Sequence, residues 1–206
     1  MTRVKICGIT RPEDGAEAAR LGVDAIGLVF YPKSPRYVTL DAARAVVAAL
    51  PPFVSVVALF VDPSRDEVEQ VLSALPIDVL QFHGDETPAF CRSFQRPYLK
   101  AVRMRPGTDL AAMAADYADA RGVLVDAFVE GVHGGTGTRF DWSLLPAALP
   151  VPLILSGGLD EHNVAEAVRQ VRPAAVDVSS GVEKSKGLKD AGRMAAFIQG
   201  AKYAAV

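Results

Sequence analysis

The 206-residue chain has few of the features that mark secreted or membrane proteins. It contains only two cysteines, Cys7 and Cys91, which cannot form the disulfide framework of a small secreted domain. No charged segment followed by an apolar run precedes the first predicted strand, and the longest apolar run, around residues 54–61, is far shorter than the roughly 18 residues that a membrane span needs. We therefore expect a cytoplasmic protein with no membrane partner.

An excess of charge of one sign is also missing. The chain has 22 basic and 24 acidic residues, a net charge of −2 and a pI near 5.9. It has no stripe of Lys and Arg interleaved with aromatic residues, so we expect no nucleic-acid partner. The histidines are scattered and form no HxxxH pair, and no CxxC pair occurs, so no metal site is predicted. The sequence instead favours a small-molecule ligand.

What the chain does contain is a regular alternation of short β-rich runs with longer segments of helical spacing. An apolar content of 50% over this length supports one core, and no linker or low-complexity stretch interrupts it, so we expect one domain spanning residues 1–206. Helices are predicted over residues 41–50, 66–75, 109–119 and 163–171. Strands are predicted over residues 3–6, 25–30, 55–61, 79–82, 98–102, 123–126, 153–155 and 175–178.

Eight β-then-α units favour a closed barrel. The predicted fold is of the α/β class, a single (β/α)8 TIM barrel, because an open sheet of eight parallel strands would need more covering helix. Two helix starts have capping-box spacing, Thr10 with Glu13 and Ser64 with Glu67. Two longer loops on the catalytic face, residues 31–37 and the glycine-rich residues 127–139, are the loops expected to contact a ligand.

Cys7 comes directly after the first predicted strand, at the C-terminal end where chemistry takes place in barrels of this kind. In a chain without a disulfide pattern, a thiol at this position is a candidate reactive group. The alternative is a small core hydrophobe, which is a common fate of free cysteine. Cys91 lies in an apolar helical stretch and is predicted to be core.

The loops after predicted strands seven and eight form the strongest local signal. They contain Gly157 and Gly158 in one loop, and Ser180 and Gly181 in the other. In barrels these two loops frequently bind phosphate, because glycines let backbone N–H groups converge on the anion and a short helix adds a favourable dipole. The alternative is a pair of tight turns. We predict a phosphate site.

Three further polar residues lie at strand ends on the same face. Asp126 ends the sixth predicted strand, and a partly desolvated carboxylic acid there can hold a proton to donate. Its alternative role is a cap of the following loop. Asp177, in the eighth strand, either contacts the ligand, orients other groups or pairs internally. His83 either contacts substrate or bonds to the next turn.

A series of short motifs follows these strand ends in chain order: KICGIT at residues 5–10, GLVF at 27–30, SPRY at 34–37, QFHG at 81–84, LVD at 124–126, GGTG at 134–137, SGGL at 156–159 and DVSSGVE at 177–183. The series resembles the phosphoribosylanthranilate isomerase family of tryptophan biosynthesis. The resemblance spans the chain from the first predicted strand to the eighth, in order. It implies a phosphosugar substrate and an Amadori rearrangement that needs neither a metal nor an organic cofactor.

The resemblance also implies roles for individual residues. Asp126 would be the general acid, and Cys7, as a thiolate, the general base. Arg36 would bind the anthranilate carboxylate through its guanidinium, while His83 and Asp177 would contact the substrate. The distal phosphate would be bound by Gly157, Gly158, Ser180 and Gly181. The oligomeric state is left open between a monomer and a homodimer.

Three other functions fit parts of the pattern. A related phosphosugar isomerase of histidine biosynthesis has a similar barrel, but its pattern has an aspartate where Cys7 stands. A cysteine hydrolase would use Cys7 with His83 and would form a covalent acyl-enzyme. A phosphate-binding protein without catalysis would leave the thiol and the acid without a role, so it ranks last.

Overall fold

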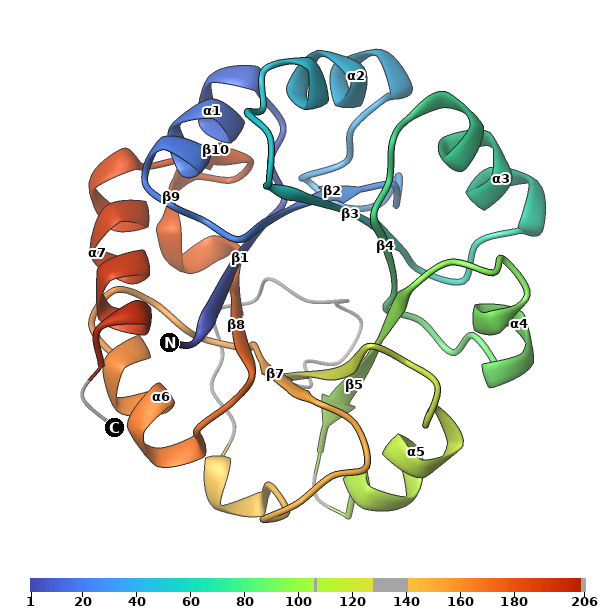
Figure 1. Cartoon of the computed structure of the whole chain (residues 1–206), viewed down its shortest axis with the longest axis vertical. Coiled ribbons are helices and arrows are strands. Elements are labelled where there is room, and N and C mark those ends of the chain that lie inside the picture. The colour runs from blue at the N-terminus through green and yellow to red at the C-terminus, as the bar shows by residue number, and fades with distance from the viewer. Residues whose placement is uncertain (106, 128–140, 205–206) are drawn as a thin grey trace.

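The computed structural model describes residues 1–105, 107–127 and 141–204. Eight parallel strands, β1 to β8, pair in chain order, and β8 pairs with β1 to close the barrel. Figure 1 shows this ring of strands in the centre with helices around it. The predicted α/β fold, a (β/α)8 barrel, is therefore confirmed.

All eight predicted strands are present, with ends that differ by at most two residues. β5 is the longest, because it continues past the predicted end at residue 102 to Met104. The strands are β1 Arg3–Cys7, β2 Ala25–Val29, β3 Ser55–Phe60, β4 Val79–Phe82, β5 Tyr98–Met104, β6 Gly122–Ala127, β7 Leu153–Leu155 and β8 Ala175–Val178.

Three of the four predicted helices are shorter than predicted, whereas α3, Arg65–Ala74, has the predicted length and is displaced by one residue. Between β6 and β7, the described residues contain only one helical segment, the short 3-10 helix η1, Trp142–Leu144. A hairpin of β9, Glu183–Ser185, and β10, Leu188–Lys189, precedes the last helix and was not predicted. The other helices are α1 Pro12–Arg20, α2 Leu40–Ala48, α3 Arg65–Ala74, α4 Pro88–Arg92, α5 Leu110–Asp116, α6 Val164–Val171, η2 Ser180–Val182 and α7 Ala191–Lys202.

One of the two predicted capping boxes is present. The Ser64 side chain and the Glu67 side chain cap α3 reciprocally. The prediction for Thr10 is wrong, because α1 begins after Arg11, and the Thr10 hydroxyl instead donates to the Gly187 carbonyl at 2.5 Å. This contact joins the loop after β1 to the β9–β10 hairpin, which lies on the same face of the barrel.

Alternation along the strands separates the outer core from the barrel interior. In β1, Val4 and Ile6 pack in the large apolar cluster between strands and helices, whereas Cys7 belongs to a small separate cluster with Val29 and Leu59. Cys91 in α4 is fully buried in the outer core, as predicted. Within the described residues, no helix is long and apolar enough to cross a membrane.

Candidate active site

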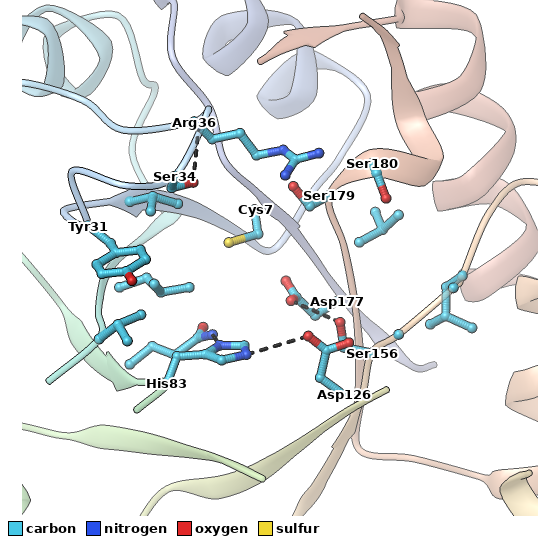
Figure 2. Close-up of a pocket in the computed structure, with 18 residues that line it drawn as sticks. Cys7, Tyr31, Ser34, Arg36, His83, Asp126, Ser156, Asp177, Ser179 and Ser180 are labelled. Carbon is cyan, nitrogen blue, oxygen red and sulfur yellow. Dashed lines mark hydrogen bonds and ion pairs between the residues drawn. The ribbon is translucent and has the colours of Figure 1, made fainter. Parts of the chain in front are cut away.

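A cavity opens at the carboxyl ends of the strands, and Figure 2 shows the side chains that surround it. It is lined by residues at the ends of β1, β2, β3, β4, β6 and β8 and by the loops after β2, β7 and β8. The structure brings eight of the nine predicted site residues to this cavity: Cys7, Arg36, His83, Asp126, Gly157, Gly158, Asp177 and Ser180.

Cys7 ends β1 and points into the cavity (Figure 2). Its thiol is packed against Val29 and Leu59. This burial raises the pKa of the Cys7 thiol because it disfavours the charged form, and Lys5 acts in the opposite direction. The backbone carbonyl of Cys7 accepts a hydrogen bond of 2.7 Å from Lys189 Nζ. This bond holds the backbone of Cys7, and the ammonium groups of Lys5 and Lys189 lie close enough to the thiol to affect its ionisation.

Asp126 and His83 lie together at the mouth of the barrel. His83 Nε2 is 3.4 Å from Asp126 Oδ2, and both side chains are almost fully buried. On its other side, His83 Nδ1 is 3.1 Å from Gln81 Nε2. If the Gln81 amide donates to Nδ1, the ring carries its proton on Nε2, directed toward Asp126. Both ring nitrogens thus face β4 and β6, and this arrangement gives no support to a Cys7–His83 hydrolase pair.

Asp177 lines the cavity and accepts hydrogen bonds from two other side chains. Its Oδ1 accepts from Lys5 Nζ at 2.8 Å, and its Oδ2 accepts from Ser156 Oγ at 3.3 Å. Burial alone would lower the pKa of Lys5, but the Asp177 charge reverses this and raises it. Of the roles open to Asp177 from the sequence, the structure shows the internal pairing. A contact with substrate stays a prediction.

Arg36 belongs to the loop after β2 and reaches across Cys7 (Figure 2). Its Nε and Nη2 donate to the two carboxylate oxygens of Glu183, both at 2.8 Å. Glu183 also accepts from Lys189 Nζ at 2.9 Å. Burial opposes ionisation of Glu183, but these two cations outweigh it and lower its pKa. Arg36 and Lys189 with one carboxylate leave an excess positive charge at this edge of the cavity.

The Glu183 pair changes how Arg36 can bind a substrate carboxylate. A guanidinium has five N–H donors in a planar fork, and Glu183 takes the Nε and Nη2 side. The Nη1 and Nη2 end still offers two parallel N–H groups to a second carboxylate. The predicted contact stays a prediction, and it now involves this end of the guanidinium.

The predicted phosphate loops lie side by side. Gly157 and Gly158 have φ of 85° and 66°, which favour glycine and turn the backbone sharply after β7. Gly157, Gly158 and Ser180 line the cavity, but Gly181 does not. A Cβ at Gly181 would overlap with the Leu159 carbonyl, so its role is to let the two loops pack together.

Metal ligation finds no support in the described part of the chain. Across residues 1–105, 107–127 and 141–204, no group of three His, Cys, Asp or Glu side chains is placed to hold a metal ion. The glycine-rich loop expected to contact the ligand begins at Ala127 in β6, and its remaining residues lie outside the described ones.

Four buried polar residues of the site have no role in the sequence prediction. Lys5 and Gln81 each lie two residues before a predicted site residue, hence on the same face of its strand, and this spacing could have identified them. Glu183 and Lys189 lie at the two ends of the hairpin, and their pairing depends on a fold that no local pattern signalled.

The fold and the site define a (β/α)8-barrel enzyme with a small-molecule cavity. Residues 4–200 match the model of the family N-(5'-phosphoribosyl)anthranilate (PRA) isomerase. The N-(5'-phosphoribosyl)anthranilate isomerase of Azotobacter vinelandii is 62% identical over 197 residues, 96% of each chain. That of Pseudomonas putida strain W619 is 58% identical over 202 residues, 98% of each chain. The chain belongs to the phosphoribosylanthranilate isomerase family.

Solved structures agree with this assignment. The crystal structure of phosphoribosyl anthranilate isomerase from Thermotoga maritima superposes with a TM-score of 0.90 at 41% identity, covering 98% of this chain and 99% of that one. A second structure, of the isomerase in complex with reduced 1-(o-carboxyphenylamino)-1-deoxyribulose 5-phosphate, has a TM-score of 0.86 at 40% identity, covering 98% and 99%. The predicted family, its isomerase activity and its place in tryptophan biosynthesis are confirmed.

Proposed function

We propose that Cys7 and Asp126 perform the Amadori rearrangement of N-(5'-phosphoribosyl)anthranilate in this cavity, as base and acid. The observation that carries the proposal is the placement of a thiol, a carboxyl group and the turn at Gly157 around one cavity at the strand ends. A related isomerase binds a reduced form of the product, so the family's cavity takes a phosphosugar joined to a carboxyphenyl group.

The first step opens the sugar ring. Asp126 gives its proton to the ring oxygen while the bond from that oxygen to C1 breaks, and the nitrogen lone pair forms the C1=N bond of a Schiff base. Asp126 becomes a carboxylate in this step. His83 Nε2, at 3.4 Å, is placed to stabilise that charge if it carries the ring proton.

The second step moves a proton from carbon. The Cys7 thiolate takes the proton from C2, the electrons of the C2–H bond form C1=C2, and the C1=N electrons return to nitrogen. The resulting enolamine tautomerises to the ketone by protonation at C1 and loss of the hydroxyl proton. The thiol acts as a base and forms no covalent bond to the substrate.

Both ends of the substrate are held in this proposal. Arg36 binds the anthranilate carboxylate at one side, and the backbone around Gly157, Gly158 and Ser180 binds the phosphate at the other. Gly181 contributes indirectly, because its missing side chain lets the loop after β8 pack closely against the Leu159 carbonyl. The length of the substrate between the two anions then places C2 near the thiol.

The reaction is tested by fluorescence. Phosphoribosylanthranilate is generated in situ, and the loss of its anthranilate emission is followed after the protein is added. We expect a loss much faster than in the protein-free control. The absence of acceleration would contradict the proposed reaction, and a trapped acyl-enzyme seen by intact mass would favour a hydrolase instead.

Arg36→Met should weaken substrate capture. A charge-assisted contact contributes about 1.5–3 kcal/mol, so kcat/KM should fall roughly ten- to over a hundredfold. Arg36→Lys should recover only part of the loss, because a point charge cannot reproduce the planar two-bond contact. Steady-state kinetics on the in situ substrate measures both effects.

The control for Arg36 is a substrate that lacks the carboxylate, the phosphoribosyl-aniline. Wild type and Arg36→Met should process it with similar efficiency, because the contact is already absent from the ligand. If the substitution impairs both substrates equally, Arg36 acts through Glu183 on the surrounding loops, and the assignment to the carboxylate is wrong.

The assembly is proposed from a relative. The Thermotoga maritima isomerase is described as dimeric in the structure of monomers generated from it, whose chain is 38% identical to this one. We propose that this chain also forms a homodimer. Sedimentation equilibrium should then give twice the mass of 21.8 kDa, and the single mass would establish a monomer.

A further inference from the structure

We propose that Lys5 is a positioning residue whose ammonium group stabilises the thiolate of Cys7, and that Asp177 holds it in place. The inference rests on the proposed function of Cys7 as the base. In this arrangement, a cation inside the barrel sets the pH at which the thiol ionises.

The strand geometry brings Lys5 and Cys7 together. They are two residues apart on β1, so both side chains face the barrel interior. Gly27 pairs with Cys7 in the neighbouring strand. A Cβ at Gly27 would lie 2.7 Å from the Cys7 Sγ and 3.1 Å from the Lys5 Nζ, so both atoms occupy the space above this one glycine. The sulfur and the ammonium are therefore neighbours.

Lys5 is held there by an ion pair. Its Nζ lies 2.8 Å from Asp177 Oδ1, and both side chains are about 6% exposed. One bond to Asp177 leaves further N–H donors of the ammonium available to a second acceptor. Because Lys5 does not line the cavity, substrate does not compete for these donors. The sulfur at Gly27 is the neighbouring group that gains a negative charge in the proposed reaction.

The other charged groups around the thiol fit this role less well. Lys189 Nζ from β10 already donates to the Cys7 carbonyl, the Ser179 carbonyl and Glu183. Arg36, from the loop after β2, is engaged by Glu183. Asp126 and His83, from β6 and β4, face each other across 3.4 Å.

The direction of each effect follows from charge. Burial of Cys7 against apolar side chains favours the neutral thiol, Lys5 favours the thiolate, and Asp177 opposes it to a smaller degree than Lys5 favours it. Removing the Lys5 charge should therefore raise the pKa of the Cys7 thiol. Removing Lys5 and Asp177 together should raise it by less, but in the same direction.

The test is the pH dependence of Cys7 alkylation by iodoacetamide, followed by intact mass. Cys91 is fully buried and burial raises its pKa to about 12, so it contributes little, and Cys7→Ala gives the blank. In Lys5→Met, the midpoint pH of alkylation should rise by about 1–3 units. Arg3→Met removes an exposed cation from the same strand and should leave the midpoint unchanged.

Two further variants control for unfolding and for the positive charge at position 5. Lys5→Met leaves Asp177 buried without its partner, which can unfold the protein, so Lys5→Met/Asp177→Asn is measured in parallel because it leaves no unpaired charge. Lys5→Arg should restore the midpoint toward that of wild type. An unchanged midpoint in the folded double variant, or a rise in Lys5→Arg equal to that in Lys5→Met, would overturn the inference.

The kinetics separate this inference from the proposed function. The rising limb of kcat/KM against pH should shift with the alkylation midpoint in the Lys5 variants. If alkylation shifts and the kinetic limb does not, Lys5 controls the thiol, but the thiol is not the base. If Cys7→Ala loses activity while Lys5→Met/Asp177→Asn alkylates as wild type does, the base assignment stands and the role of Lys5 is wrong.

Discussion

Cys7→Ala should lower turnover by about 10²–10⁴-fold or more, because it removes the base that takes the proton from C2. Binding of a product analogue should persist, because the proposed phosphate and carboxylate contacts lie on other loops. The measurements are steady-state kinetics for turnover and calorimetry for the analogue. Near-normal turnover in the variant would exclude Cys7 as the base.

Cys7→Ser is the matched control for size and polarity. A hydroxyl has a far higher pKa than a thiol and cannot act as a base near neutrality, so the turnover of this variant should also be strongly reduced. Burial raises the pKa of the Cys7 thiol, so the wild-type thiolate fraction and kcat/KM should increase with pH through the neutral range. A serine variant that retained turnover would show that the group acts by hydrogen bonding.

The barrel was predictable because hydrophobic periodicity marks each strand. Strands such as β4 and β8 were placed without error, since each is a short buried run bounded by turn residues. The hairpin of β9 and β10 escaped prediction for a physical reason. Its strands are three and two residues long and expose Lys184 and Ser185, so they carry no apolar alternation, and their position is set by contacts with α1 and the loop after β1.

The site was predictable to the extent that strand ends reveal it. Cys7 and Asp126 lie at the C-terminal ends of apolar strands, and the barrel topology alone brings such residues to one face. The ion pairs among them were not predictable. Arg36 and Glu183 are separated by 146 intervening residues, and their bidentate contact exists only because the hairpin returns over β1. What the sequence predicts is therefore which groups meet, whereas the structure determines how each is paired.

Gln81, in β4, is another residue whose pairing could not be predicted from the sequence. Its side chain is fully buried, with Nε2 toward His83 and Oε1 without a hydrogen-bond partner among the described residues. A glutamine in an apolar strand has no sequence signal beyond its spacing from His83. Its position nevertheless affects which nitrogen of His83 faces Asp126, so the environment of the proposed acid extends beyond the motif residues.

Asp126→Asn should depress turnover by about 10²–10⁴-fold with little change in binding of the product analogue. The amide keeps the shape of the carboxyl group but has no transferable proton, so ring opening loses its acid. Steady-state kinetics measures turnover, and calorimetry measures binding of the analogue.

His83 provides the comparison that distinguishes acid catalysis from general damage to this edge of the cavity. His83→Gln removes the imidazole beside Asp126 but leaves the carboxyl group in place. We expect it to lower turnover much less than Asp126→Asn. If Asp126→Asn keeps near-normal turnover, the acid must be another group, and Asp177, already bound to Lys5, becomes the next candidate.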